Sequence, residues 1–240
     1  MQAAILAGGL GTRLRPLTDK VPKAMAPVNG RPFLEYELEL LASHGVDDIV
    51  LCVGYKGEMI RDHFGDGSGF GVKIRYSSEG ERLLGPIGGL KMAERMLRKE
   101  FFVTYGDAYL RLDYRGMMDA LMGHEELAVM AVYRNQGRHG RSDVVVKDGF
   151  VAAYDKVSQV PGMEWINFGV TAMRRDALAK VEPGRVTDEQ TFYGRLVRER
   201  QLRALEVSER FYEVGSERSL AEFAGFVSDR GATRGAPTTA

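Results

Sequence analysis

Short apolar runs alternate with helix-forming segments over residues 3–133, and this alternation restricts the fold more than any other feature. The apolar runs cover residues 3–6, 48–55, 72–76, 101–107 and 127–133. Between them, apolar residues recur at helical spacing, as Leu34, Leu38 and Leu41 do. This pattern predicts an α/β fold of the Rossmann-like kind, with a mostly parallel, doubly wound sheet and helices on both faces.

The character of the chain changes from about residue 140. Residues 142–156 alternate around Asp148-Gly149, which predicts an antiparallel hairpin, and a further strand is expected at 165–173. A capping box of Thr187 with Gln190 predicts the start of a helix, and Ser216 is expected to cap the last one. These segments predict a small antiparallel part within a single domain at 1–227. The last residues, 228–240, lack Val, Ile, Leu and Phe and are expected to form a disordered tail.

Charge and composition exclude several classes of protein. The 33 basic residues equal the 33 acidic ones, which argues against a general nucleic-acid binder or a membrane-surface protein. A single cysteine, Cys52, excludes an internal disulfide and a cysteine-based zinc site. No secretory signal is visible, and no apolar run approaches the roughly 18 residues of a membrane span. We therefore expect a cytoplasmic protein without nucleic-acid or membrane partners.

The loop after the first strand, AGGLGTRLRPLTDKVPKAMAPVNG, combines glycines with cations. Glycines allow backbone N–H groups to approach a phosphate, and Arg13 offers a planar fork of donors for the same group. Neither a P-loop nor a dinucleotide fingerprint is present, because GK[ST] is missing and Leu14 stands where the third glycine would be. On the glycines and arginines of GGLGTRLR alone, a phosphate site and a glycine-rich turn with solvated arginines remain equal alternatives, and the string VPKAMAPVNGRP that follows favours the phosphate site.

Other strand ends carry polar residues or glycines, where ligands bind in such sheets. Asp107 follows an apolar strand, so its carboxylate is either a helix cap or a metal ligand. A second glycine-rich loop, residues 83–89, opens a helix. Gly54-Tyr55 ends another strand and is equally compatible with a base pocket and a simple turn.

Two strings together carry a resemblance: GGLGTRLRPLT at residues 8–18 and PKAMAPV at residues 22–28. They resemble the sugar-phosphate nucleotidyltransferases (NDP-sugar pyrophosphorylases), and the likeness extends over residues 1–227. The resemblance implies that an NTP and a sugar 1-phosphate give an NDP-sugar and pyrophosphate, with Mg²⁺ as cofactor. It also implies two catalytic cations, Arg13 on the leaving β,γ-phosphates and Lys23 on the α-phosphate.

The resemblance further implies binding residues. For the nucleotide these are Leu6, Ala7, Gly8, Gly9, Gly11, Thr12, Gly54, Tyr55, Gly85 and Gly88. For the sugar phosphate they are Tyr105, Gly106, Asp155, Lys156, Asn167 and Gly169, and for the metal Asp107 and Glu213. Three positions depart from the family pattern: Tyr105 replaces asparagine, Pro86 replaces threonine, and Glu213 replaces aspartate.

The run from Lys23 through the segment 54–71, GYKGEMIRDHFGDGSGFG, most resembles the guanylyltransferases of D-glycero-D-manno-heptose 1-phosphate. This implies GTP and a heptose 1-phosphate as substrates. Another NTP with another sugar or cyclitol phosphate stays open, as does assembly into a homo-oligomer. A non-catalytic nucleotide-sugar sensor is a further alternative, but such a protein should have lost cations or metal ligands, and Arg13, Lys23 and Asp107 are present.

Overall fold

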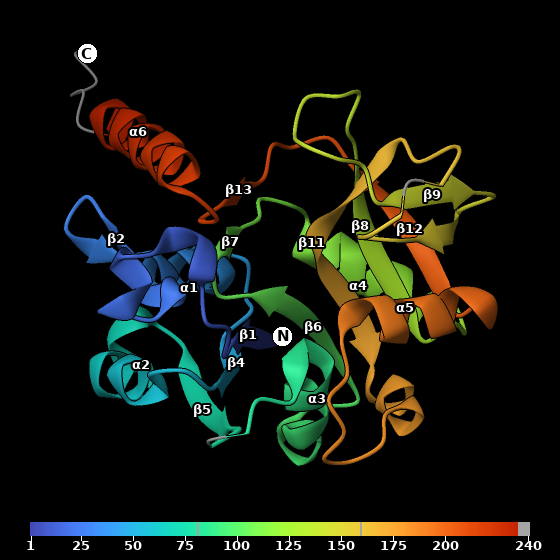
Figure 1. Ribbon diagram of the computed structural model, residues 1–240, viewed down its shortest axis with the longest axis horizontal. Coiled ribbons are helices and arrows are strands. Elements are labelled where there is room, and N and C mark those ends of the chain that lie inside the picture. Colours follow the sequence, from blue (N-terminus) through green and yellow to red (C-terminus); the bar gives the residue numbers. More distant parts are fainter. Residues whose placement is uncertain (81, 159, 235–240) are drawn as a thin grey trace.

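The computed structural model of the chain describes residues 1–80, 82–158 and 160–234. A nine-stranded mixed sheet runs through it in the order β5-β4-β1-β6-β11-β8-β12-β10-β9 (Figure 1). Its strands are β1 Gln2–Ala7, β4 Asp48–Val53, β5 Lys73–Ser78, β6 Glu100–Tyr105, β8 Ala128–Arg134, β9 Val144–Lys147, β10 Phe150–Tyr154, β11 Trp165–Arg174 and β12 Leu202–Val207. Two short pairs stand apart, β2 Pro27–Val28 with β3 Arg31–Pro32 and β7 Ala108–Tyr109 with β13 Tyr212–Glu213.

The first half of the sheet follows the predicted pattern. Strands β5, β4, β1 and β6 are parallel to one another, as expected from the alternation of apolar runs and helices. The chain passes from β1 to β4 and β5 on one side, then returns to β6 on the other side of β1. Ligands of such sheets bind outside the carboxyl ends of the strands where the order reverses. A ligand-binding site is therefore expected at the carboxyl ends of β1 and β6.

The second half of the sheet contradicts the prediction of a mostly parallel, doubly wound sheet. Strand β11 lies antiparallel between β6 and β8, so the fifth apolar run does not pair with β6. Strand β9 pairs with β10 and also with β11, which closes β11-β8-β12-β10-β9 into a small barrel. The predicted hairpin is present as β9 and β10, but it belongs to the main sheet and not to a separate part.

Helices cover both faces of the sheet because successive residues of its central strands are apolar and point to opposite faces. Ile5 packs in a core with helices α1 Phe33–Ser43, α2 Gly57–Phe64 and α4 Tyr114–Met122. The neighbouring Ala4 packs on the opposite face with α3 Gly85–Met92 and α5 Glu189–Arg198. Short 3₁₀ helices form the connections: η1 Thr12–Leu14, η2 Leu17–Asp19, η3 Lys23–Met25, η4 Ser68–Phe70, η5 Glu94–Met96 and η6 Arg175–Lys180.

The last helix, α6 Glu217–Arg234, packs beside α1 and β2 (Figure 1). Its Phe223 ring lies 4.8 Å from that of Phe33. Ser216 caps it as predicted, since its Oγ accepts from the Ser219 N–H at 3.1 Å. The predicted disordered tail is wrong for residues 228–234, which continue the helix; residues 235–240 lie outside the described residues.

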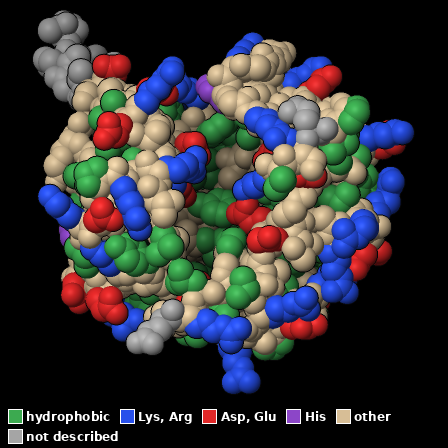
Figure 2. All heavy atoms as spheres, viewed as in Figure 1, with side chains coloured by type: hydrophobic (Ala, Val, Ile, Leu, Met, Phe, Trp, Pro, Cys, Tyr) green, Lys and Arg blue, Asp and Glu red, His purple; other side chains and the backbone are tan. Residues whose placement is uncertain are grey.

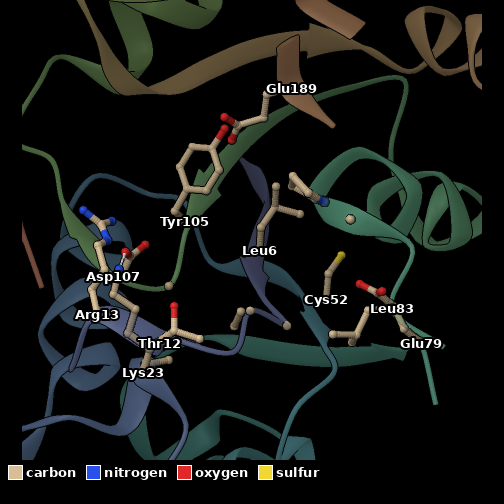
Figure 3. A pocket seen from close by; sticks show the side chains of 18 residues that line it. Leu6, Thr12, Arg13, Lys23, Cys52, Glu79, Leu83, Tyr105, Asp107 and Glu189 are labelled. Carbon is tan, nitrogen blue, oxygen red and sulfur yellow. Dashed lines mark hydrogen bonds and ion pairs between the residues drawn. The ribbon is translucent and has the colours of Figure 1, made fainter. Parts of the chain in front are cut away.

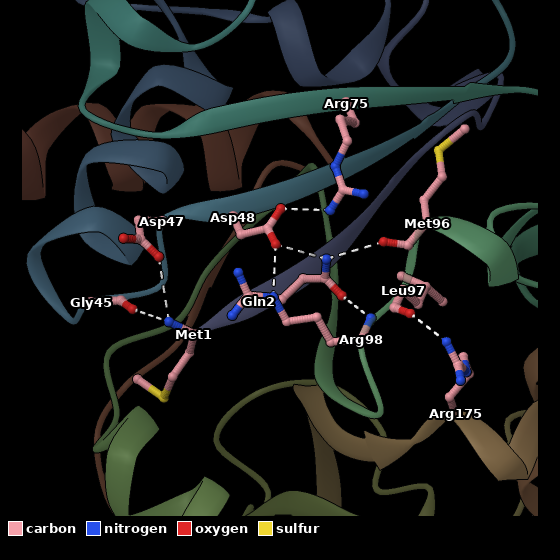
Figure 4. A network of polar contacts seen from close by, with 10 residues as sticks. All are labelled: Met1, Gln2, Gly45, Asp47, Asp48, Arg75, Met96, Leu97, Arg98 and Arg175. Carbon is pink, nitrogen blue, oxygen red and sulfur yellow. Dashed lines mark hydrogen bonds and ion pairs between the residues drawn. The ribbon is translucent and has the colours of Figure 1, made fainter.

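A polar network links the amino ends of the parallel strands, at the edge of the sheet opposite their carboxyl ends (Figure 4). Asp48 accepts hydrogen bonds from Gln2 Nε2 at 3.0 Å, Arg75 Nη2 at 2.7 Å and Arg98 Nε at 2.9 Å. Burial alone would raise the pKa of Asp48, but the two arginines outweigh it and hold that pKa below its usual value. Within the described ranges, no helix is both long and apolar enough to span a membrane.

Candidate active site

A tight glycine loop leads away from the end of β1. A Cβ on Gly8 would lie 3.2 Å from the Gly54 nitrogen, so the loop backbone packs directly on the end of β4. Gly11 has a φ of 62°, and a Cβ there would lie 2.8 Å from the Thr18 methyl carbon. Thr18 in turn donates a hydrogen bond from Oγ1 to the Gly11 carbonyl at 2.9 Å. Only glycine fits this conformation, which leaves the loop free to approach a ligand.

Two cations, Arg13 and Lys23, come from the short helical turns that follow the glycine loop. Buried Leu14 anchors η1, which carries Arg13, and buried Ala24 anchors η3, which carries Lys23. Lys23 Nζ forms an ion pair with the carboxylate of Asp107, which follows β6. Arg13 forms no ion pair within the described part of the chain. The site therefore presents one cation held on a carboxylate and one guanidinium free for an anionic ligand.

A cavity of about 410 Å³ lies over the ends of β1 and β6, between the two halves of the molecule (Figures 2 and 3). This volume lies within the range of about 300–1,000 Å³ that is common for small-molecule sites. Arg13, Lys23 and Asp107 line one end of it (Figure 3). Glu79 and Leu83 line the opposite end, beside Cys52, and Pro86 also lines the cavity.

Glu79 is a residue of this cavity that the sequence motifs did not reveal. Its Oε2 accepts a hydrogen bond from the Leu84 N–H at 2.5 Å, which fixes the side chain at the mouth of the second glycine-rich loop. Gly89 lies so close to Oε1 that a Cβ there would collide with it. Burial raises the pKa of Glu79, and the hydrogen bond from Leu84 opposes that shift.

A second cavity, of about 650 Å³, adjoins the first on the side of the small barrel. Lys156, Asn167 and Gly169 line it, as do Asp143 and Glu213. Asp143, which the motifs also missed, accepts the Asn167 N–H at 2.9 Å, and burial raises its pKa. The two cavities share four lining residues: Arg13, Tyr105, Asp107 and Glu189. The cavities thus meet beside the free guanidinium and the Asp107 carboxylate.

Asp107 and Glu213 come together although 106 positions separate them. Strand β13 pairs with β7, which places Glu213 opposite Ala108, and the Val214 N–H donates to the Asp107 carbonyl at 2.8 Å. Both residues line the second cavity. The described residues contain no group of three or more His, Cys, Asp or Glu suited to a metal. Two carboxylates could hold a hard divalent cation whose remaining ligands are water and phosphate oxygens.

The structure brings together most of the predicted site residues. Those that line the first cavity are Leu6, Ala7, Gly8, Gly9, Gly11, Thr12, Arg13, Lys23, Gly85, Tyr105, Gly106 and Asp107. Those that line the second are Lys156, Asn167, Gly169 and Glu213, together with three of the first group. Four predicted residues line neither cavity: Gly54, Tyr55, Gly88 and Asp155.

These four residues have other surroundings. Gly54 packs on Gly8, where a Cβ would lie 2.9 Å from the Gly8 carbonyl oxygen, and the Tyr55 N–H donates to that oxygen at 3.3 Å. A Cβ on Gly88 would lie 2.8 Å from the Arg185 carbonyl oxygen, so this glycine permits α3 to pack closely. The Asp155 carboxylate accepts two backbone N–H groups in the turn after β10, both at 2.7 Å.

The start of helix α5 differs from its prediction. The helix begins at Glu189, and Asp188 caps it by accepting the Thr191 N–H at 2.7 Å. The prediction of a capping box formed by Thr187 and Gln190 is therefore wrong, because Asp188 is the N-cap and accepts the free N–H of the first turn. Gln190 instead contacts the end of β10, and Glu189 enters both cavities.

Comparisons with known proteins identify the family of this chain. The family model for "Nucleotidyl transferase" matches residues 2–145. The D-glycero-α-D-manno-heptose 1-phosphate guanylyltransferase of Campylobacter jejuni is 35% identical over 178 residues, covering 73% of this chain and 77% of the relative. The UTP–glucose-1-phosphate uridylyltransferase of Synechocystis is 40% identical over 142 residues, covering 55% of this chain and 36% of the relative.

A solved structure shows the same fold. HddC from Yersinia pseudotuberculosis, complexed with GMP-PN, superposes with a TM-score of 0.77 at 24% identity, over 94% of this chain and 99% of that one. The chain belongs to the nucleotidyl transferase family. Within that family it is a sugar-1-phosphate nucleotidyltransferase enzyme, as the two strings at residues 8–28 indicated.

Proposed function

We propose that the chain transfers a guanylyl group from GTP to a heptose 1-phosphate, giving a GDP-heptose and pyrophosphate, with Mg²⁺ as the metal. The observation that carries the choice of GTP is the Glu79 carboxylate, which lies at the end of the first cavity remote from Arg13 and Lys23 (Figure 3). The guanylyltransferase from Campylobacter jejuni supports the same choice of nucleotide and acceptor.

The orientation of the nucleotide follows from charge. A triphosphate belongs at the end of the cavity that holds the glycine loop and the two cations, Arg13 and Lys23. The base then lies at the opposite end, against Leu83 and Pro86 and within reach of Glu79. A carboxylate there meets the edge of the base, where polar complementarity decides which base is accepted.

Guanine is the base whose edge matches a carboxylate. Its N1–H and its N2 amino group are adjacent donors, and an ionised carboxylate only accepts. Uracil and thymine place a single N–H between two carbonyl oxygens, which would face the Glu79 oxygens. Adenine and cytosine place a ring acceptor beside their amino group. The carboxylate therefore favours guanine over the other four bases.

The transfer needs no general base from the protein. The attacking group is an oxygen of the acceptor phosphate, which is mostly dianionic at pH 7 because its second pKa is about 6. This oxygen forms the new bond to the α-phosphorus, and the bond from the α-phosphorus to the bridging oxygen of pyrophosphate breaks. In this proposal Lys23 contacts the α-phosphate, where charge gathers, and Arg13 contacts the leaving pyrophosphate; both side chains line the first cavity. The protein thus acts by positioning and charge neutralisation.

The donor set at the junction of the cavities fits Mg²⁺. Asp107 and Glu213 supply two hard carboxylate ligands, and Mg²⁺ usually takes one or two of these together with phosphate oxygens and water. The Asp107 carboxylate already pairs with a cation, the Lys23 ammonium, and both residues line the first cavity, which supports this role. When bound, the metal would neutralise part of the charge on the phosphates.

The role of Glu79 is tested with GTP and ITP, since inosine lacks the N2 amino group. In the unmodified chain we expect kcat/KM to favour GTP over ITP by about 10- to 100-fold, the value of one charged hydrogen bond. Glu79→Gln should lower kcat/KM for GTP and bring the GTP/ITP ratio close to one. Pyrophosphate release measures both ratios, and Glu58→Gln, an exposed glutamate on α2, is the matched control. A variant that retains the full GTP/ITP ratio would show that Glu79 does not contact the base.

A further inference from the structure

Glu189 is the first residue of α5, and its side chain is almost enclosed, with 10% exposed. It lines both cavities, and its carboxylate forms an ion pair with Lys156 Nζ. The Tyr154 hydroxyl donates to the same oxygen, Oε2, at 3.3 Å. Lys156 itself is half-exposed at the edge of the second cavity, so the carboxylate is what fixes the position of its flexible side chain.

The next residue of the helix fixes the backbone of the same lysine. Gln190 accepts the Lys156 N–H at Oε1, at 2.9 Å, and donates from Nε2 to the Tyr154 carbonyl at 3.1 Å. The first turn of α5 therefore holds Lys156 at both its main chain and its ammonium. These contacts tie α5 to the end of β10, although 33 positions separate Lys156 from Glu189.

Glu189 also faces the first cavity, where it lies beside Tyr105 (Figure 3). Burial raises the pKa of Tyr105 well above its usual value, and the neighbouring Glu189 adds to that shift, so the ring carries a neutral hydroxyl. Arg13 and Asp107 lie on the other side of this junction (Figure 3). The Glu189 carboxylate thus lies at the point where the two cavities meet.

A purely structural role at the helix start does not account for this arrangement. A carboxylate in the first turn stabilises a helix by about 0.3–1 kcal/mol, wherever in that turn it lies. Asp188 already supplies such a carboxylate and caps the helix. Glu189 is directed away from the free N–H groups and toward Lys156 and Tyr154.

We propose that Glu189 is a positioning residue for the acceptor substrate: it holds the Lys156 ammonium at the junction of the cavities, ready for the phosphate of the sugar 1-phosphate. This inference rests on the proposed function, since it assigns the second cavity to the acceptor. An incoming phosphate carries close to two negative charges and becomes the main partner of the ammonium, while Glu189 supports Lys156 from the opposite side. The lysine side chain is then ordered before the substrate arrives.

The test is a double-mutant cycle on acceptor kinetics, with Glu189→Ala, Lys156→Met and the double variant. We expect Glu189→Ala to lower kcat/KM for the acceptor on the order of tenfold, within the usual range for coupled residues, and to leave KM for the nucleotide within about twofold. In the Lys156→Met background it should cause no further loss. Losses that simply multiply would mean that Glu189 does not act through Lys156 and would overturn the proposal.

Asp188→Ala is the matched control because it removes the helix cap without touching Lys156. It should lower the melting temperature and keep kcat/KM for the acceptor; a loss equal to that of Glu189→Ala would assign the effect to the helix start and overturn the proposal. If Glu189→Ala fails to fold, Glu189→Gln, which keeps the shape and removes the charge, takes its place in the same cycle. If the unmodified chain releases pyrophosphate from no pair of NTP and sugar phosphate, the proposed function fails and this inference with it.

Discussion

Replacing Lys23 with alanine is expected to lower kcat by about two to three orders of magnitude, the cost of removing one donor aimed at developing charge. Lys23 lines the first cavity and pairs with Asp107, which lies at the junction of the two cavities. In the proposed reaction its ammonium faces the α-phosphate, where negative charge increases as the acceptor oxygen attacks. Because this interaction strengthens in the transition state, the loss should appear in kcat more than in KM for the nucleotide.

The measurement is pyrophosphate release under saturating nucleotide and acceptor. Lys20→Ala is the matched control, since Lys20 belongs to the same loop, is exposed and lines neither cavity. A Lys23→Ala variant with nearly normal kcat would show that this lysine only neutralises Asp107 and takes no part in the transfer.

Asp107→Asn is expected to lower turnover at least about a hundredfold and to raise the concentration of Mg²⁺ needed for half-maximal rate. Asparagine keeps the size of the side chain but removes the charge that would hold the metal. Stability without metal should fall by about 1–3 kcal/mol, because the Lys23–Asp107 pair is largely buried, with 18% and 24% of the two side chains exposed, and asparagine leaves the ammonium an uncharged partner. Turnover is measured as a function of Mg²⁺ concentration, and melting temperature in the presence of a chelator.

The control for this variant is Asp119→Asn, an exposed aspartate on α4 that lines neither cavity. It should leave both the rate and the Mg²⁺ requirement unchanged. An Asp107→Asn variant with normal Mg²⁺ dependence would remove Asp107 from the metal site and leave only its pairing with Lys23.

The glycine loop, Arg13, Lys23 and Asp107 could be predicted because each is determined locally. The glycines follow a strand directly, the cations follow the glycines, and the aspartate ends the next central strand. The parallel half of the sheet was predictable for the same reason, since alternating apolar runs and helices favour parallel pairing. The family resemblance rested on these same segments, and the match to residues 2–145 confirmed it.

The missed features depend on contacts between distant segments. The insertion of β11 between β6 and β8, and the closure of the barrel by β9, follow from pairings that no local pattern encodes. Glu79 is a lone glutamate after a strand, and only the fold places it in the cavity.

The acidic partner of Lys156 shows the same limit of sequence reasoning. The resemblance implied that Asp155 binds the sugar phosphate, but its carboxylate is used in a turn, and the acidic residue that contacts Lys156 is Glu189 from α5. Both residues follow the end of β10, where the Asp155 carboxylate accepts the N–H groups of Val157 and Ser158, so adjacency in sequence did not place both side chains in one cavity.

Pyrophosphate release by the unmodified chain, with D-glycero-α-D-manno-heptose 1-phosphate and Mg²⁺, tests the central claim most directly when GTP, ATP, UTP, dTTP and CTP are compared in parallel. The account predicts that GTP gives the highest kcat/KM and that GDP-heptose forms in equal amount to pyrophosphate. A higher kcat/KM with another nucleotide, or no release with any of the five, would contradict it.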